Sequence, residues 1–292
     1  MKGLRAVRNW RQLRRRRPAL VLPLLGTLVL GGCSGLGGAS TDSEAANPTA
    51  QSNLGSLSEV IQKHPDDPQA YNLRGSALAA AGSDEAALAD FNKAISLDPN
   101  YAQAYGNRGL LYRQNGKPDL ALADYNKAIA IDGNYAAAYL GRGIVYRQQG
   151  RTAQALADFN KSIALRPDNA QAYYNRGLLY QSQHQQQIAI DDFTTALGLT
   201  NQRAELFVTR GLSYLAFGDA KSAASDLDEA VQLQPQNVQA WTSRGLAYER
   251  LGAKDKAAGS YAKALNLNDK YVPAKEGFTR VGGKAGQSYE TF

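Results

Sequence analysis

Few side chains in this chain are of the types that catalyse reactions or bind metals. Its 292 residues include one cysteine, Cys33, and two histidines, His64 and His184. A disulfide framework, a zinc cluster or a CxxC redox site each needs at least two cysteines. Both histidines are expected at the surface, far from each other, which disfavours a Ser–His–Asp arrangement or a histidine-based metal site. The sequence predicts no catalytic residues, no metal and no cofactor.

The net charge of +7 is concentrated at the amino terminus. Residues 1–32 contain eight basic and no acidic side chains, which leaves 25 basic and 26 acidic residues in the rest of the chain. A nearly neutral remainder has no general attraction for phosphate backbones, so we expect no nucleic-acid partner.

The amino-terminal segment has the pattern of a secretion signal that ends at Cys33. A basic stretch precedes an apolar run over 19–30, which is too short to span a bilayer as a helix. The sequence Leu30-Gly31-Gly32-Cys33 resembles the lipobox of bacterial lipoproteins. This resemblance implies cleavage before Cys33 and lipid attachment to it, and Ser34 favours the outer membrane facing the periplasm. An ordinary signal peptide with an incidental cysteine is the alternative.

A period of 34 residues governs the chain from 68 to 270. One position is aromatic in every unit, and a glycine follows it four residues later. The aromatic residues are Tyr71, Tyr105, Tyr139, Tyr173, Phe207 and Trp241, and the glycines are Gly75, Gly109, Gly143, Gly177, Gly211 and Gly245. Apolar positions recur at helical spacing in two segments of each unit, about 69–81 and 85–97 in the first.

This pattern resembles the tetratricopeptide repeat (TPR) family, whose period is 34 residues. The resemblance implies an all-α fold, a TPR α-solenoid that forms a right-handed superhelix of six helix-turn-helix repeats with capping helices at both ends. The expected organisation is a lipoprotein signal peptide (1–32), a lipid-anchored flexible tether (33–52), an N-terminal half-repeat cap (53–67), six repeats (68–270), a C-terminal capping helix (271–282) and a flexible tail (283–292).

Glycines at two kinds of position support this fold. In five units a glycine ends the first helix, where a left-handed residue is expected. These glycines are Gly82, Gly116, Gly150, Gly218 and Gly252. The remaining unit has His184 at this position. The glycines inside the first helices are expected to leave room for the second helix, since glycine otherwise costs about 1 kcal/mol there.

An arginine precedes each of these mid-helix glycines, and an aspartate lies 16 residues after five of them. The arginines are Arg74, Arg108, Arg142, Arg176, Arg210 and Arg244; the aspartates are Asp90, Asp124, Asp158, Asp192 and Asp226, with Ser260 in the sixth unit. We expect a structural ladder of partly buried ion pairs rather than a site for an anionic ligand.

In TPR proteins the first helices line a concave groove that binds extended or helical peptides. Transferred by position, this implies a partner-binding site at Asn72, Asn107, Arg113, Arg147, Tyr174 and Asn175. Asparagine can pair with a peptide backbone, and arginine can bind a carboxylate. The alternative is that these residues are solvated and without function. The lysine-and-asparagine clamp of chaperone-binding TPR proteins is not matched.

The expected function is a membrane-anchored envelope scaffold or adaptor that binds protein or peptide partners, with the membrane contacted through the lipid on Cys33. In architecture it resembles NlpI-like lipoprotein adaptors. The alternative is a pilotin-like or self-associating structural component of an envelope assembly.

Overall fold

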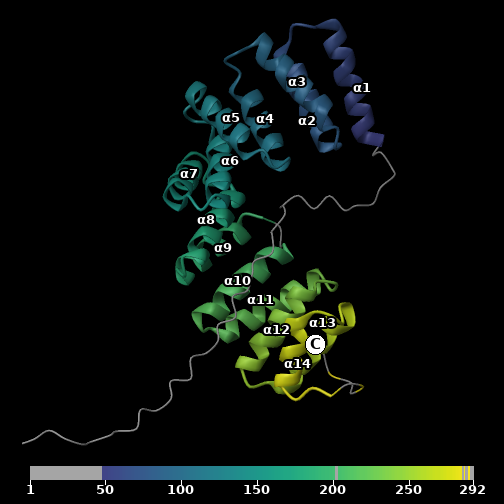
Figure 1. Cartoon of the computed structure of the whole chain (residues 1–292), viewed down its shortest axis with the longest axis vertical. Helices are drawn as coiled ribbons and strands as arrows, with labels where there is room; N and C mark the ends of the chain where they lie inside the picture. The colour runs from purple at the N-terminus through teal and green to yellow at the C-terminus, as the bar shows by residue number, and fades with distance from the viewer. Residues whose placement is uncertain (1–47, 201–202, 285, 287–288, 290–292) are drawn as a thin grey trace, which may run out of the picture. The chain divides into compact units, whose positions relative to one another are not determined.

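The computed structural model describes residues 48–200, 203–284, 286 and 289, and in that part of the chain every regular element is an α-helix. The helices are α1 (Pro48–Lys63), α2 (Pro68–Ala80), α3 (Asp84–Leu97), α4 (Ala102–Gln114), α5 (Pro118–Ile131), α6 (Ala136–Gln148), α7 (Thr152–Leu165), α8 (Ala170–Ser182), α9 (Gln186–Gly198), α10 (Ala204–Phe217), α11 (Ala220–Leu233), α12 (Val238–Arg250), α13 (Lys254–Leu267) and α14 (Val272–Arg280) (Figure 1). The predicted all-α fold is confirmed.

Six helical hairpins follow one another along the chain. They are α2/α3, α4/α5, α6/α7, α8/α9, α10/α11 and α12/α13, and each packs against the next (Figure 1). The helix α1 packs on α2 at one end, and α14 packs on α12 and α13 at the other. The helix α1 begins at Pro48, inside the range expected to be tether. Cys33 and the rest of 1–47 lie outside the described residues.

The turns of five hairpins have the left-handed glycine that the sequence predicted. The five turn glycines have φ between 66°, at Gly116, and 99°, at Gly218. His184 takes the same position in the fourth hairpin with φ 59°, and it is the one non-glycine residue with positive φ in the described part of the chain. Both histidines are exposed, as expected.

The mid-helix glycines are sites of close helix–helix approach. A Cβ added at Gly177 would lie 2.7 Å from the ring of Phe193, and one at Gly143 would lie 2.8 Å from Phe159. The other four meet the corresponding side chain of their own hairpin at 2.7 to 3.1 Å. The prediction that these positions have no room for Cβ is confirmed, and it explains why the helix tolerates glycine there.

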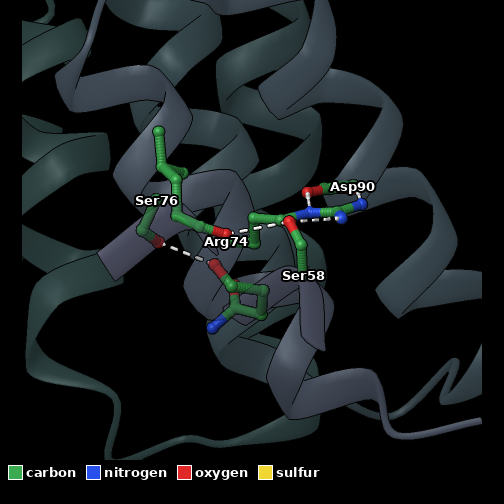
Figure 2. Close-up of polar contacts among 6 residues, drawn as sticks. Ser58, Arg74, Ser76 and Asp90 are labelled. Carbon is green, nitrogen blue, oxygen red and sulfur yellow. Dashed lines mark hydrogen bonds and ion pairs between the residues drawn. The ribbon is translucent and has the colours of Figure 1, made fainter. Parts of the chain in front are cut away.

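The arginine ladder is present, and it joins neighbouring repeats as well as the two helices of one hairpin. In five repeats Nε and Nη2 of the arginine donate to both carboxylate oxygens of its aspartate, at 2.7 to 2.9 Å. Nη1 donates to a side chain on the second helix of the preceding repeat, or on α1 for the first. For the first repeat, Figure 2 shows Arg74 with Asp90 and with Ser58. The later acceptors are Asn92, Asn126, Asn160 and Thr194.

In the sixth repeat Arg244 also bonds to the second helix of its own hairpin and to that of the preceding hairpin, but its partners on them differ. Its Nη1 donates to Ser260 at 2.9 Å, and its Nε donates to Asp228 of the preceding second helix at 2.6 Å. The carboxylate that Ser260 lacks is therefore supplied from α11. The pattern of arginine and aspartate predicted the pairs within each hairpin but missed the contacts between repeats.

Candidate partner-binding face

The helices α2, α4, α6, α8, α10 and α12 form one face of the stack, called here the first-helix face. Successive first helices touch directly at α2–α4, α4–α6, α6–α8 and α10–α12. Two hydrogen bonds connect α8 with α10: the amide of Gln181 donates to Ser213 at 2.8 Å, and Tyr174 donates to Glu205 at 2.9 Å. All six predicted partner-binding residues lie on these helices.

Two of the predicted residues are bonded to each other at the start of this face. The Asn107 amide nitrogen donates to the Asn72 side-chain oxygen at 2.9 Å and to Ser76 at 3.2 Å. Asn72 is buried and donates to the hydroxyl of Tyr101 at 3.1 Å. These polar groups connect α2 with α4, so they hold neighbouring repeats in register.

Tyr174, Asn175 and Arg147 form the same kind of connection further along. Asn175 is buried; its amide donates to the Gln171 carbonyl at 2.8 Å, and its side-chain oxygen accepts from Arg147 at 3.4 Å. Tyr174 is buried beside Phe193, with ring centroids 5.9 Å apart. Five of the six predicted residues (Asn72, Asn107, Arg147, Tyr174 and Asn175) are thus bonded within the stack. Arg113 and Arg147 are half-buried at its surface.

Arg113 lies beside the hydroxyl of Tyr125, a residue that sequence reasoning did not assign to this face. Burial raises the pKa of Tyr125, and the nearby Arg113 guanidinium partly opposes that rise. Neither the Tyr125 hydroxyl nor Nε of Arg113 has a hydrogen-bond partner of good geometry among the described residues. Tyr125 belongs to α5, so its helical periodicity alone places it in the core.

At the other end of the face, Glu249 occupies the position that is arginine in the second and third repeats, as Arg113 and Arg147. Glu249 accepts from Tyr261 at 2.7 Å and from Arg280 of α14 at 2.6 and 2.9 Å. Burial opposes ionisation of Glu249, but the hydrogen bonds from Arg280 and Tyr261 outweigh it and hold its pKa below the ordinary value. Glu249 is therefore ionised at neutral pH.

The surface of this face also carries exposed side chains that take no part in these connections. Gln114 and Gln148 are exposed at the ends of α4 and α6, and Leu110 is 40% exposed although it is apolar. No group of three or more potential metal ligands converges within the described residues. None of the described helices is both long and apolar enough to cross a bilayer.

Comparison with known families agrees with this geometry. Family models described as "TPR repeat" match residues 75–116 and 143–184, and models described as "Tetratricopeptide repeat" match 102–135, 170–203 and 208–271. Together these matches cover more than half of the chain. A comparison with curated protein sequences gave no significant match.

Solved structures show the same fold at low identity. PilF of Pseudomonas aeruginosa is 20% identical, with a TM-score of 0.66 over 73% of this chain and 97% of that one. PilW, described as a type IV pilus biogenesis factor, is 21% identical, with a TM-score of 0.59 over 66% and 90%. The Cut9–Hcn1 hetero-tetramer of the APC/C contains a chain 19% identical, with a TM-score of 0.67 over 80% of this chain, which spans only 46% of that one.

The stacked hairpins and their continuous first-helix layer define a helical-repeat scaffold of the kind that mediates protein–protein interaction. The chain belongs to the tetratricopeptide repeat family.

Proposed function

We propose that this chain is a membrane-anchored scaffold of the cell envelope that binds protein or peptide partners on its first-helix face. The observation that carries the proposal is that residue types on this face differ from repeat to repeat, whereas the arginines of the ladder are the same in every repeat. The residues four after the mid-helix glycines are half-buried in five repeats, namely Ala79, Arg113, Arg147, Gln181 and Glu249, and the buried Leu215 in the fifth, whereas the residue before each of those glycines is always arginine. Packing requires no such variety, so a surface fitted to a particular partner accounts for it best.

The envelope part of the proposal rests on the amino-terminal sequence. A lipid on Cys33 would place the repeats next to the membrane, and two or more acyl chains give stable anchoring at about 0.8 kcal/mol per buried CH₂. Tethering then raises the local concentration of any bound partner at that membrane without new contacts.

The anchor can be tested by replacing Cys33 with serine in a bacterial host. We expect the wild-type chain in the membrane fraction and the Cys33→Ser chain in the soluble fraction, because the variant has no thiol to acylate. Ser34→Ala is the matched control and should fractionate like the wild type. Fractionation of Cys33→Ser with the membrane, in the amount seen for wild type, would refute the lipid anchor.

The partner face can be tested by changing exposed residues only. The double variant Leu110→Glu with Gln148→Glu alters α4 and α6 on the first-helix face. We expect it to recover at least about tenfold less of the partner from solubilised envelopes, since new charges on a contact surface weaken binding by more than about 1.4 kcal/mol. The measurement is quantitative mass spectrometry of material captured on the tagged chain.

The matched control carries the same changes on the second helices of the same two repeats. Leu120→Glu with Gln154→Glu changes two exposed side chains on α5 and α7. This control should capture the partner as well as wild type does. Equal losses in both double variants, or no loss in either, would contradict binding on the first-helix face.

A component of pilus assembly is the second candidate. It is favoured by the likeness to PilW, described as a type IV pilus biogenesis factor, over most of that protein's length. The same capture experiment separates the two candidates, because pilus-assembly proteins would dominate the material recovered with the wild-type chain but not with the first-helix variant.

A further inference from the structure

The residue before the left-handed turn residue differs between the first four hairpins and the last two. In the first four hairpins this residue is Ala81, Asn115, Gln149 and Gln183. The fifth hairpin has Phe217 there and the sixth has Leu251. Phe217 is 56% exposed and Leu251 is 46% exposed, so a large part of each apolar side chain lies in water. Packing within the stack therefore does not account for either residue.

The backbone of these two turns places both side chains at the border of the stack. Gly218 and Gly252 follow them with positive φ, which reverses the chain at the end of the first helix. A Cβ added at either glycine would meet nothing within 4 Å, so both turns face open space.

The two turns belong to one continuous edge. The helices α10 and α12 contact each other, and Nη1 of Arg250 donates to the main-chain carbonyl of Leu215. Arg250 is next to Leu251 in the sequence, so this bond brings the two turns together. Residues 216–221 and 250–256 are called here the turn edge.

The turn edge is also more basic than the same edge at the start of the array. It contains four basic and two acidic side chains, a net charge of +2: Lys221, Arg250, Lys254 and Lys256, with Asp219 and Asp255. All four cations are exposed. The equivalent segments of the first two repeats, 80–85 and 114–120, contain one basic and three acidic side chains, a net charge of −2: Lys117, with Asp84, Glu85 and Asp119. Apolar tips and positive charge thus occur together only in the last two repeats.

This combination matches the surface of a bilayer. Apolar side chains enter the boundary between headgroups and acyl chains, while lysine and arginine keep their charged ends at the headgroups. Anionic lipids attract cations held at this distance. A second copy of the chain would bring the same +2 edge against it, so like charges would oppose that contact.

We propose that the turn edge contacts the surface of a membrane that contains anionic lipid. Phe217 and Leu251 enter the region between headgroups and acyl chains, and the surrounding cations lie beside the lipid phosphates. The inference goes beyond the proposed function, because it adds a membrane contact that uses neither Cys33 nor the first-helix face. Together with a lipid on Cys33, this contact would fix the orientation of the array on the membrane.

The test compares two exposed positions that carry the environment-sensitive dye NBD in otherwise identical full chains. Cys33 is replaced by serine, so Ala216→Cys or Gln148→Cys supplies the one thiol of each protein. Ala216 is next to Phe217, and Gln148 is the same position of the third repeat. Both proteins have the same amino terminus, so membrane binding by residues 1–32 affects them equally.

We expect vesicles of phosphatidylethanolamine with phosphatidylglycerol to shift the emission at residue 216 to the blue, and to leave residue 148 unchanged. Vesicles of phosphatidylcholine should give a much smaller shift at residue 216. An equal response at both positions, or none at residue 216, would overturn the membrane contact. So would a blue shift at residue 216 that grows with protein concentration in the absence of vesicles, because that result identifies a second copy as the occupant.

The apolar contribution is tested with residue types that the array already uses at this position. Phe217→Gln with Leu251→Gln should lower the ratio of inserted to free dye at residue 216 by at least about tenfold, since two partly exposed apolar side chains no longer enter the bilayer. The matched control is Leu120→Gln with Ile188→Gln, which removes side chains 48% and 45% exposed on α5 and α9. The control should keep the ratio of wild type, and equal losses in both would contradict the proposal.

The electrostatic contribution is tested in the same way. Lys221→Gln with Lys254→Gln should lower the ratio on phosphatidylglycerol vesicles by at least about tenfold, because each cation near an anionic surface contributes roughly fivefold. Lys127→Gln with Lys161→Gln removes two exposed cations of α5 and α7 and should have no effect. Circular dichroism should show the same Tm for all variants, since every changed side chain is exposed. Neither the lipid anchor nor partner capture enters these measurements, so their failure would leave the proposed function standing.

Discussion

Replacing Asp124 by alanine is expected to lower the free energy of unfolding by about 3 kcal/mol. The side chains of Asp124 and Arg108 are 8% and 18% exposed, and two hydrogen bonds of 2.8 Å join them. Breaking a buried pair by removing one partner costs about 3–5 kcal/mol because the other charge stays buried and uncompensated. The remaining exposure of Arg108 places the value at the lower end. Urea denaturation followed by circular dichroism measures it.

The control for this prediction is an ion pair that lies at the surface. Asp168 pairs with Arg166 at 3.1 Å, and both side chains are more than 60% exposed. Exposed pairs contribute about 0–1 kcal/mol, so Asp168→Ala should change stability by less than that. If Asp124→Ala unfolded at the same urea concentration as Asp168→Ala, the arginine ladder would have no structural role.

The repeat architecture could be predicted because packing imposes the same demand at every 34th residue. The mid-helix glycines recur since an aromatic ring or leucine of the second helix leaves no room for Cβ, as at Gly177 and Phe193. The turn glycines recur since φ must be positive, and His184 was recognised as an exception that the backbone still holds at 59°. The residue at such a position is determined by backbone geometry that all repeats share. Its repetition within one sequence is therefore enough to identify it.

The candidate site was harder to predict, because its residues differ from repeat to repeat. Position placed Asn72, Asn107 and Asn175 on the first-helix face correctly, yet it could not show that they bond to one another or to Arg147 across repeats. Their role in binding a partner stays a prediction. Long-range pairing of this kind depends on which side chain lies opposite, 28 to 35 residues away, and periodicity carries no information on that.

One part of the site did leave a signal in the sequence. Where the second-helix residue is tyrosine, the residue 16 positions later is glycine: Tyr125 with Gly141 and Tyr261 with Gly277. Where it is phenylalanine or leucine, that residue has a side chain: Asn107, Asn175, Thr209 and Ser243. A hydroxyl makes the ring longer, so only glycine leaves enough space for it. Comparison of the six repeats at this spacing is therefore enough to distinguish Tyr125 from the other core aromatic residues.

This pairing predicts a large destabilisation that a second substitution should relieve. Gly141→Asn is expected to lower the free energy of unfolding by about 2–3 kcal/mol, since its Cβ would overlap the Tyr125 ring and overpacking of this kind costs about 1–3 kcal/mol. Tyr125→Phe alone should cost little, because the hydroxyl has no hydrogen-bond partner of good geometry to lose. The double variant has arginine, phenylalanine and asparagine at positions 113, 125 and 141, between α4 and α6. These are the residue types that occur together between α6 and α8, as Arg147, Phe159 and Asn175.

The double variant should therefore regain at least about 1 kcal/mol relative to the sum of the single effects, a coupling typical of residues in contact. Urea denaturation of the four proteins of this cycle gives that coupling directly. Gly133→Asn is the matched control, because an added Cβ there meets nothing within 4 Å, and it should leave the midpoint close to wild type. Strict additivity of Tyr125→Phe and Gly141→Asn would mean that the hydroxyl does not determine the glycine. In that case the pairing of Tyr125 with Gly141 would lose its physical basis.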